Sequence, residues 1–308
     1  MRHSHARDDK GLGNAGRGVP TVPHHVFGPP LGSPRLALVG GFGASDFDGV
    51  SVLSRLASFL RRVDASGETG RWRLAAPIIV VPAALELQST AHRQFGTAET
   101  LAGIEDCTSG ALRRIAIRSS DRNLEHLPQV RLETPDEDER EAACLFGLPV
   151  VEESGKRRAD RSLGSAWRAH GGESFDIVVG RSGQLEPIFC ESVFRAILAF
   201  MGRVGLLHGV DLAEDETDLH YFEANRLFDL RCGARGLFVT HRNVGEWLQA
   251  GDTVGSVYDA FDGDPRHEVC TPVGGLLSAL RRQPLVEAGA SVARVLANQA
   301  SKNSSSAF

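Results

Sequence analysis

Short apolar runs alternate with amphipathic helical stretches over the first two thirds of this chain. Residues 35–39 are a compact apolar run, and residues 50–60 then carry apolar side chains at three- and four-residue steps. Two more apolar runs, at 76–82 and 114–117, enclose a helical stretch at 97–112. Length and period distinguish buried strands from amphipathic helices in such a pattern. Strand, helix and strand in alternation predict a mainly parallel sheet with helices on its faces.

The alternation continues to residue 205. Thr134 is interpreted as a helix cap, with Pro135 at the first helical position and Glu137 at the third, because this arrangement satisfies the free N–H groups of a first turn. Residues 175–179 form another apolar run, and residues 193–204 have an amphipathic helical pattern. We therefore expect an α/β domain that closes with a helix.

The pattern changes after an acidic stretch near residues 211–218. Short apolar segments separated by Gly and Asp then follow at roughly ten-residue intervals, as in small all-β domains. At the other end, the first 33 residues have several histidines among Gly, Pro and Arg but almost no apolar periodicity, so they cannot form a core. The sequence predicts a flexible arm at 1–33, an α/β domain at 34–208, an acidic linker at 209–225, a β domain at 226–297 and a flexible tail at 298–308.

Composition argues against several classes of partner. The 308 residues are 42% hydrophobic and 24% charged, with a formal net charge of −5, which is ordinary for a soluble globular protein. This charge offers no basic surface to nucleic acid, and no apolar run approaches the about 20 residues that a membrane helix needs. The five cysteines are odd in number and form no CxxC pair, so we expect reduced thiols. These features favour a cytoplasmic protein with neither a nucleic-acid nor a membrane partner.

The β segment carries a family resemblance. In order, the chain has Gly236-Leu237-Phe238, a Gly-Asp-x-Val-Gly turn at 251–255, a Pro-x-Gly-Gly stretch at 272–275 and a Val-x-x-Gly ending at Gly289. This set resembles the C-terminal barrel-sandwich domain of succinylglutamate desuccinylase/aspartoacylase proteins. The resemblance extends to the first strand-loop-helix, the Val81-Pro82 strand end, the segment 119–132 and the helix before residue 205, and so covers most of residues 35–297. It implies a zinc-carboxypeptidase-like fold, a mainly parallel mixed sheet flanked by helices, with a small C-terminal all-β domain.

The resemblance also implies where a zinc site should be. Enzymes of this family hold one zinc with a His-x-x-Glu after the first strand and a later His, and a separate Glu activates the zinc-bound water. Matching on the glycine that begins the family's helix, here Gly49, puts Gly43 at the His position and Asp46 at the Glu position. Matching on the segment 127–130 puts Arg118 at the third ligand. The catalytic Glu, expected after the apolar run at 175–179, falls on Gly180.

Arg118 and a zinc ion are nearly incompatible neighbours. A guanidinium about 4 Å from a dication would repel it by roughly 8 kcal/mol at an effective dielectric constant near 20. A simpler arrangement is that the guanidinium fills the vacated metal position and pairs with Asp46, which would otherwise be a lone buried carboxylate. We therefore expect an Arg118–Asp46 ion pair and no bound zinc.

Other residues are candidates for binding. Arg93 stands where relatives have an arginine that handles the substrate, although it is equally a solvated loop arginine. His92 and His126 each follow or flank a predicted strand end near the family cleft, but a lone histidine is more often a surface or hydrogen-bonded residue. The triplet Asp218-Leu219-His220 spells a family ligand motif within the linker, far from the strand that should carry it. The stretch 40–43 is glycine-rich but lacks the spacing of a phosphate loop.

Two functions remain open from the sequence. The first is a non-catalytic relative that has lost zinc and binds an acyl-amino-acid-like or peptide-like ligand, or a partner protein, through Arg93, Arg118, His126 and Asp46, with no cofactor. The second is an active metal-dependent amidohydrolase that removes an N-acyl group from an amino acid, with zinc held by other ligands. Loss of the usual side chains at all three ligand positions and at the base favours the first.

Overall fold

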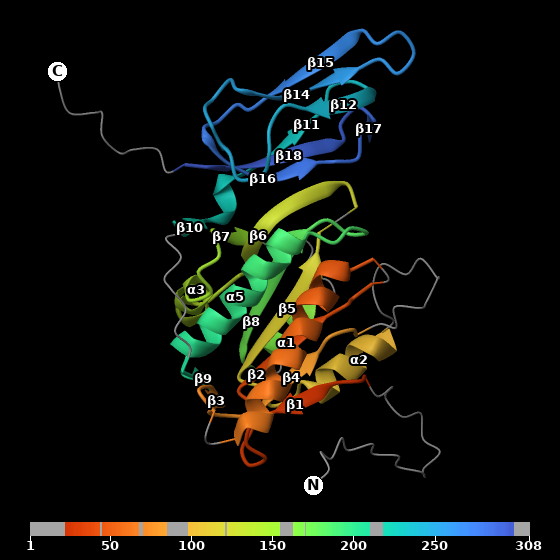
Figure 1. Cartoon of the computed structure of the whole chain (residues 1–308). Coiled ribbons are helices and arrows are strands. Elements are labelled where there is room, and N and C mark those ends of the chain that lie inside the picture. The colour runs from red at the N-terminus through yellow and green to blue at the C-terminus, as the bar shows by residue number, and fades with distance from the viewer. Residues whose placement is uncertain are drawn as a thin grey trace, which may run out of the picture.

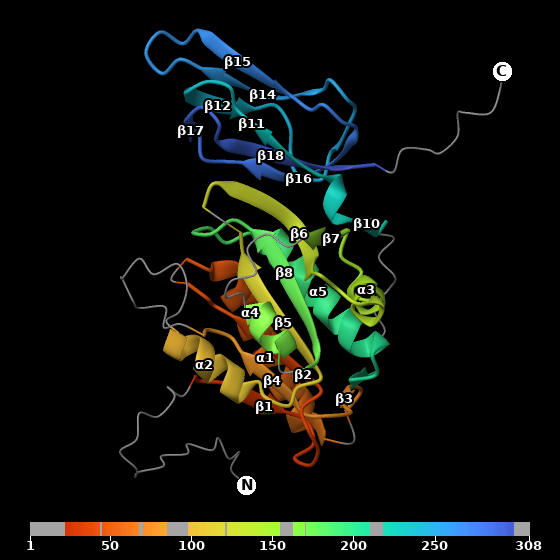
Figure 2. The ribbon, with the colours of Figure 1, turned by 180° about the vertical axis from the view of Figure 1, so that it is seen from behind.

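The computed structural model describes residues 22–43, 45–67, 70–84, 98–120, 122–154, 163–169, 171–209 and 218–298. Helices surround a central sheet, and the C-terminal strands stack on one end of it (Figure 1). Figure 2 shows the same arrangement from behind. The first 21 residues of the predicted arm, residues 210–217 of the predicted linker and the tail after residue 298 lie outside the described residues.

Four parallel strands form the centre of the sheet. Their spatial order is β4 (Ile78–Val81), β2 (Leu36–Gly40), β5 (Arg113–Ser119) and β8 (Glu173–Gly180). Leu38 lies opposite Val80 on one side and Ile115 on the other. Their apolar runs are buried on both faces, as parallel strands between two helix layers must be. The strands predicted from apolar runs are confirmed, and so is their parallel order.

Further strands extend the sheet on both sides of these four. β1 (His25–Phe27) runs antiparallel to β4, and β6 (Leu124–Glu133) runs antiparallel to β8. β7 (Val150–Ser154) pairs in parallel with β6, and β10 (His220–Phe222) pairs in parallel with β7. A separate pair joins β3 (Arg73–Leu74) to β9 (Leu207–His208). Phe27 is buried in the main core, so part of the predicted arm (1–33) belongs to the α/β fold, which was predicted to start at residue 34.

Helices cover both faces of the sheet. α1 (Phe47–Ser66), α3 (Glu137–Cys144) and α5 (Pro187–Arg203) share one core with the even-numbered apolar residues of β2. α2 (Ala98–Cys107) and α4 (Leu163–Ala169) bury Ile104 and Trp167 against the opposite face. The helices predicted around 50–60 and 193–204 are therefore confirmed, and the one predicted at 97–112 is present but ends at Cys107. Within the described residues, no helix combines the length and apolarity that crossing a membrane would need.

The start of α3 differs from the sequence-based expectation. Asp136, not Thr134, caps the helix: its carboxylate accepts a hydrogen bond of 2.8 Å from the Glu139 backbone nitrogen. The Glu139 side chain accepts one in return from the Asp136 nitrogen. This reciprocal pair is a capping box. Thr134 has φ +47, a left-handed conformation that redirects the chain before the helix rather than capping it.

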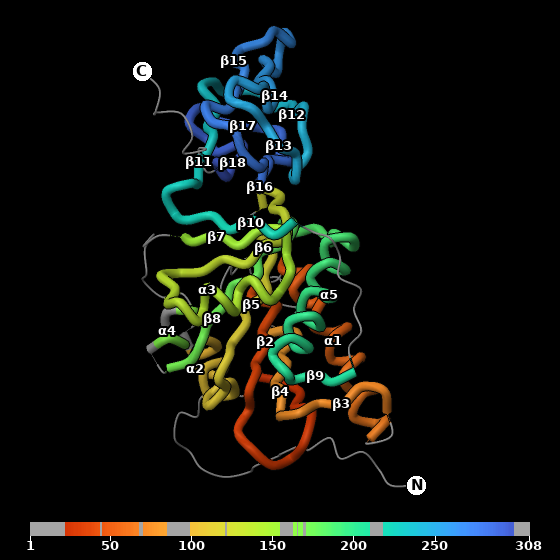
Figure 3. Tube along the Cα trace, turned by 90° about the vertical axis from the view of Figure 1, so that its left-hand side faces the viewer, coloured from red at the N-terminus to blue at the C-terminus, as the bar shows by residue number. Residues whose placement is uncertain are grey.

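The C-terminal strands form a second layer that continues the main sheet. β11 (Leu227–Arg231), β13 (Trp247–Leu248), β16 (Gly275–Arg281) and β18 (Ser291–Ala297) belong to the 12-stranded sheet, because β16 pairs antiparallel with β6. β12 (Gly236–Thr240), β14 (Thr253–Tyr258), β15 (Pro265–Cys270) and β17 (Leu285–Val286) form a four-stranded sheet. A core separate from that of the α/β part lies between them. Figure 3 shows β7 and β10 beneath these strands, where the chain crosses from one part to the other.

Candidate functional site

The carboxyl ends of β2, β5 and β8 meet at one edge of the sheet. β2 ends at Gly40, β5 at Ser119 and β8 at Gly180, and these strands are direct neighbours in the order β2-β5-β8. The chain leaves β2 through residues 41–46 and enters α1. Ligands of open parallel sheets bind at this edge, and the sequence-based candidates Gly43, Asp46, Arg118 and Gly180 all lie along it.

Asp46 is held by the backbone around it. Its Oδ2 accepts hydrogen bonds of 3.1 Å from the nitrogens of Gly41 and Phe42, and its Oδ1 accepts one of 2.6 Å from the Ser119 nitrogen. The residue is 6% exposed. Burial raises the pKa of Asp46, and these hydrogen bonds act in the opposite direction. The carboxylate therefore ties the loop after β2 to the end of β5.

Asp48 is a second buried carboxylate that the sequence did not single out. Its Oδ1 accepts from the Glu186 nitrogen at 2.9 Å and from the Cys190 thiol at 3.3 Å, and its Oδ2 accepts from the Ser119 hydroxyl at 3.1 Å. Burial raises its pKa, and the charge of Asp46 adds to the rise. Burial and this carboxylate raise the pKa of Cys190 to about 12, which keeps the thiol protonated as a donor. Only the packing of α1 against α5 brings these groups together, so no local sequence signal marks them.

The prediction that Arg118 pairs with Asp46 was wrong, because Arg118 pairs with Asp176. The Arg118 guanidinium donates to Asp176 on β8 through both Nε, at 2.9 Å, and Nη2. Successive residues of a strand point to opposite faces. Ser119 faces Asp46 and the α1 side, so Arg118 faces the other side of the sheet, where Asp176 lies. The neighbouring Asp176 carboxylate raises the pKa of Arg118 and keeps it charged.

Gly180 has no room for a glutamate in this arrangement. Its φ is +57, a left-handed value, and a Cβ added there would lie 2.6 Å from Oδ2 of Asp48. A side chain at this position would therefore displace Asp48 or change the backbone. The carboxylate of Asp48 occupies the space beside the predicted position of the catalytic base.

The side chains at this edge do not fit a zinc ion. Catalytic zinc takes three protein ligands drawn from His, Cys and carboxylates. Gly43 has no side chain, both oxygens of Asp46 accept backbone hydrogen bonds, and Arg118 is a cation paired with Asp176. Ser119, the β5 residue that faces Asp46, offers only a hydroxyl. Among the residues that the structure describes, no group of three or more His, Cys, Asp or Glu side chains is placed to hold a metal.

The other sequence candidates are placed as follows. His126 lies on β6 opposite Gly180 and is buried, and its Nδ1 has no hydrogen-bond partner among the residues that the structure describes. Burial, followed by the charges of Arg131, Arg294 and Arg118, lowers its pKa well below the ordinary value, so it is neutral. His92 and Arg93 lie outside the described residues. His220 begins β10 and stacks edge-on against Trp247, and β6 and β7 separate its strand from β8.

Comparisons with known proteins agree with this architecture. No protein-family model matches the chain, and no curated protein matches it. Among solved structures, a succinylglutamate desuccinylase/aspartoacylase from Rhodobacter sphaeroides is 18% identical, with a TM-score of 0.69 over 90% of each chain. The apo ectoine utilization protein EutE (DoeB) from Ruegeria pomeroyi is 17% identical, with a TM-score of 0.70 over 90% of each chain. An aspartoacylase family protein from Mesorhizobium loti is 17% identical, with a TM-score of 0.66 over 91% of this chain and 90% of that one. The chain therefore has the fold of the succinylglutamate desuccinylase/aspartoacylase proteins.

Proposed function

We propose that this protein is a non-catalytic relative of the succinylglutamate desuccinylase/aspartoacylase hydrolases, and that it binds an acyl-amino-acid-like or peptide-like ligand without zinc. The fold supports the relation, because these proteins match about 90% of the chain. The residues at the carboxyl ends of β2, β5 and β8 support the loss of zinc and of catalysis.

The observation that carries the proposal is the commitment of Asp46 to the backbone. Each hydrogen bond to a charged group contributes about 1.5 to 3 kcal/mol, and an unpaired buried donor costs a comparable amount. Turning Asp46 toward a metal would break its bonds to Gly41, Phe42 and Ser119 and leave these N–H groups buried. We therefore assign Asp46 to holding the loop, and not to the metal or ligand contact that its position in the sequence predicted.

Arg118 supports a ligand that carries a carboxylate. Asp176 holds its Nε and Nη2, while Nη1 has no hydrogen bond within the described part of the chain, and a third of the side chain is exposed. A guanidinium fixed along one edge presents its remaining donors in a defined direction, which suits a carboxylate. N-acyl amino acids and peptide C-termini both supply this group. The neutral His126 lies across the same strand end and adds no competing charge.

Metal analysis with an activity panel tests the loss of zinc. Untagged protein that begins at Val22 keeps β1 and removes His3 and His5 from the metal count. We expect less than about 0.1 equivalent of zinc, because the three ligands of a catalytic site are missing. No turnover of N-acetyl or N-succinyl amino acids is expected, with or without added zinc. Stoichiometric zinc together with zinc-dependent turnover would contradict the proposal.

Calorimetric titration with the same compounds tests the binding role. Arg118→Ala is expected to weaken binding of N-acetyl and N-succinyl amino acids about tenfold, the effect of losing one charge-assisted contact. Arg266→Ala on β15 is the matched control, because within the described part of the chain this arginine pairs with Asp259 and Asp262 of its own hairpin and with no other acidic residue. Equal affinities of the Arg118 and Arg266 variants would show that Arg118 does not contact the ligand.

The second candidate is an active metal-dependent deacylase. The enzyme names printed for two of the similar structures, a succinylglutamate desuccinylase/aspartoacylase and an aspartoacylase family protein, favour it. Its metal would need donors such as His92, outside the described residues. The metal analysis separates the two candidates, because only the deacylase requires stoichiometric metal.

A further inference from the structure

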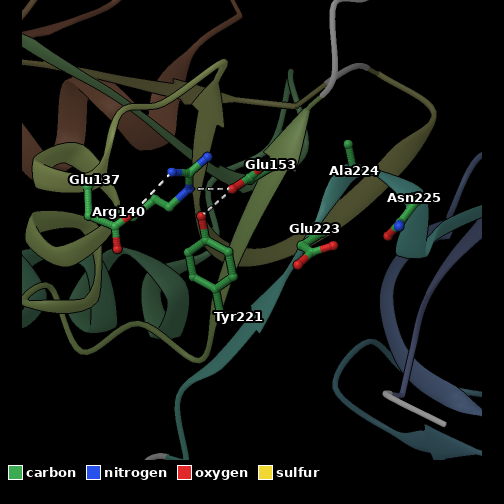
Figure 4. Close-up of a pocket in the computed structure, with 7 residues that line it drawn as sticks. All are labelled: Glu137, Arg140, Glu153, Tyr221, Glu223, Ala224 and Asn225. Carbon is green, nitrogen blue, oxygen red and sulfur yellow. Dashed lines mark hydrogen bonds and ion pairs between the residues drawn. The ribbon is translucent and has the colours of Figure 1, made fainter.

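A concavity of about 450 Å³ lies away from the candidate site, between the two parts of the fold (Figure 4). Helix α3 contributes Glu137 and Arg140, β7 contributes Glu153 and β10 contributes Tyr221. Glu223, Ala224 and Asn225, at the 3-10 helix η2 (Ala224–Arg226), complete the lining. A space of this size is in the range of small-molecule sites. The segment with α3 and β7 is distant in sequence from the segment with β10 and η2, so only the tertiary fold creates the concavity.

One wall is a fixed hydrogen-bonded group. Oε1 of Glu153 accepts from the Tyr221 hydroxyl at 2.6 Å and from Nε of Arg140 at 2.9 Å, while Arg140 Nη1 donates to Glu137 at 3.3 Å. Figure 4 shows the hydroxyl end of Tyr221 directed at Glu153. Both donors use Oε1. No hydrogen bond to Oε2 of Glu153 is present within the described residues. Burial alone would raise the pKa of Glu153, but the bonds from Tyr221 and Arg140 lower it below the ordinary value, which keeps the group charged.

Glu223 brings a further negative charge beside this wall. β10 pairs in parallel with β7, with Tyr221 opposite Val151 and Phe222 opposite Glu152. Continuing this register puts Glu223 beside Glu153, and strand alternation points Tyr221 and Glu223 to the same side. No cation of the described residues pairs with the Glu223 carboxylate. Like charges on neighbouring strands repel each other, so the arrangement favours a positively charged occupant.

The charges and their spacing define the kind of occupant. Glu137, Glu153 and Glu223 give three negative charges and Arg140 gives one positive, which leaves two uncompensated negative charges facing one concavity. A metal ion requires oxygens that converge on one point, and within the described part of the chain no three acidic or His/Cys groups do so. An organic ammonium instead contacts carboxylates that are spread around it, and an aromatic ring such as that of Tyr221 attracts its charge. We propose that this concavity binds a small organic cation, a primary amine or diamine of about amino-acid size.

Ligand-observed NMR titration of the full chain tests this site with 1,4-diaminobutane as the probe. We expect saturable binding, and about threefold to fivefold weaker binding to Glu223→Gln, the effect of losing one exposed ion pair. Glu223 is exposed, and its side chain has no hydrogen bond or ion pair among the described residues, so we expect this variant to keep its structure. Glu287→Gln is the matched control, because it removes an exposed carboxylate in the C-terminal part that pairs with Arg235; its affinity should equal that of the unmodified chain.

A neutral probe of the same length, 1,4-butanediol, separates charge recognition from simple filling of the space. No saturable binding of the diol is expected. The proposal is overturned if the diamine does not saturate, if Glu223→Gln and Glu287→Gln bind it equally, or if the diol binds as well as the diamine. None of these results depends on zinc or on deacylation, so they are independent of the function proposed above.

Discussion

The Ser119 backbone nitrogen donates a hydrogen bond of 2.6 Å to Oδ1 of the buried Asp46. The hydroxyl of the same serine donates to Asp48, so one residue at the end of β5 engages two carboxylates at the start of α1. The family resemblance implies that metal ligands and a catalytic base would lie along this edge in an active enzyme. In this chain, Asp46 and Asp48 at the same edge accept hydrogen bonds from other groups of the protein.

Replacing Asp46 should destabilise the fold without any metal being involved. Asp46→Ala leaves the nitrogens of Gly41, Phe42 and Ser119 without their acceptor, and we expect a loss of about 2 to 4 kcal/mol in the free energy of unfolding. Urea denaturation measures it. Glu141→Ala, on the exposed side of α3, is the control and should change stability by less than about 0.5 kcal/mol. A small loss for Asp46→Ala would mean that the loop does not depend on this carboxylate.

Stability should depend on pH through Asp48. Its pKa in the folded state is raised above the ordinary value of 3.8, so above that pH the folded state holds more protons than the unfolded state. The stabilising contribution is present below pH 3.8 and is lost as the pH rises through the folded-state pKa. Asp48→Asn cannot titrate at this position. Urea denaturation at increasing pH should therefore show the variant gaining stability relative to the unmodified protein, and a pH-independent difference would contradict the assignment.

Gly180 and Gly183 form a matched pair. Both have left-handed φ values, +57 and +87, but only a Cβ at Gly180 meets Asp48, whereas one at Gly183 meets nothing within 4 Å. Gly183→Ala should cost about 1 kcal/mol from backbone strain alone. Gly180→Ala should cost measurably more in the same urea titration, because the methyl group also displaces the carboxylate. Equal losses would show that Asp48 moves aside freely.

Restoring histidines at the family positions should not restore a metal site. In Gly43→His/Arg118→His, the second imidazole points to the side of the sheet opposite Asp46, because Ser119 already takes the facing position on β5. Zinc titration with a chromophoric chelator should show no tighter binding than in either single variant. A stoichiometric complex that resists the chelator would show that the strand can present residue 118 to Asp46.

The local elements were predictable because their signals are local. Apolar runs and helical periods located β2, β4, β5, β8, α1 and α5, and the ordered glycine turns of the β segment indicated the C-terminal strands. The cap of α3 was misplaced by two residues, because Thr134 and Asp136 are both good capping residues and only the backbone conformation distinguishes them. The continuation of the main sheet through β16 into the C-terminal part has no local signal, since it depends on pairing with β6.

The sequence by itself determined that Gly43 supplies no ligand and that Arg118 brings a positive charge, because these are properties of residue types. Only the tertiary structure decided which groups those residues meet. Because successive residues of β5 face opposite sides of the sheet, Ser119 bonds to Asp46 and Arg118 bonds to Asp176. The packing of α1 against α5 brings Asp48, Glu186 and Cys190 together. Side-chain contacts between elements distant in sequence depend on which face each residue occupies, and that is fixed only when the sheet and its helices assemble.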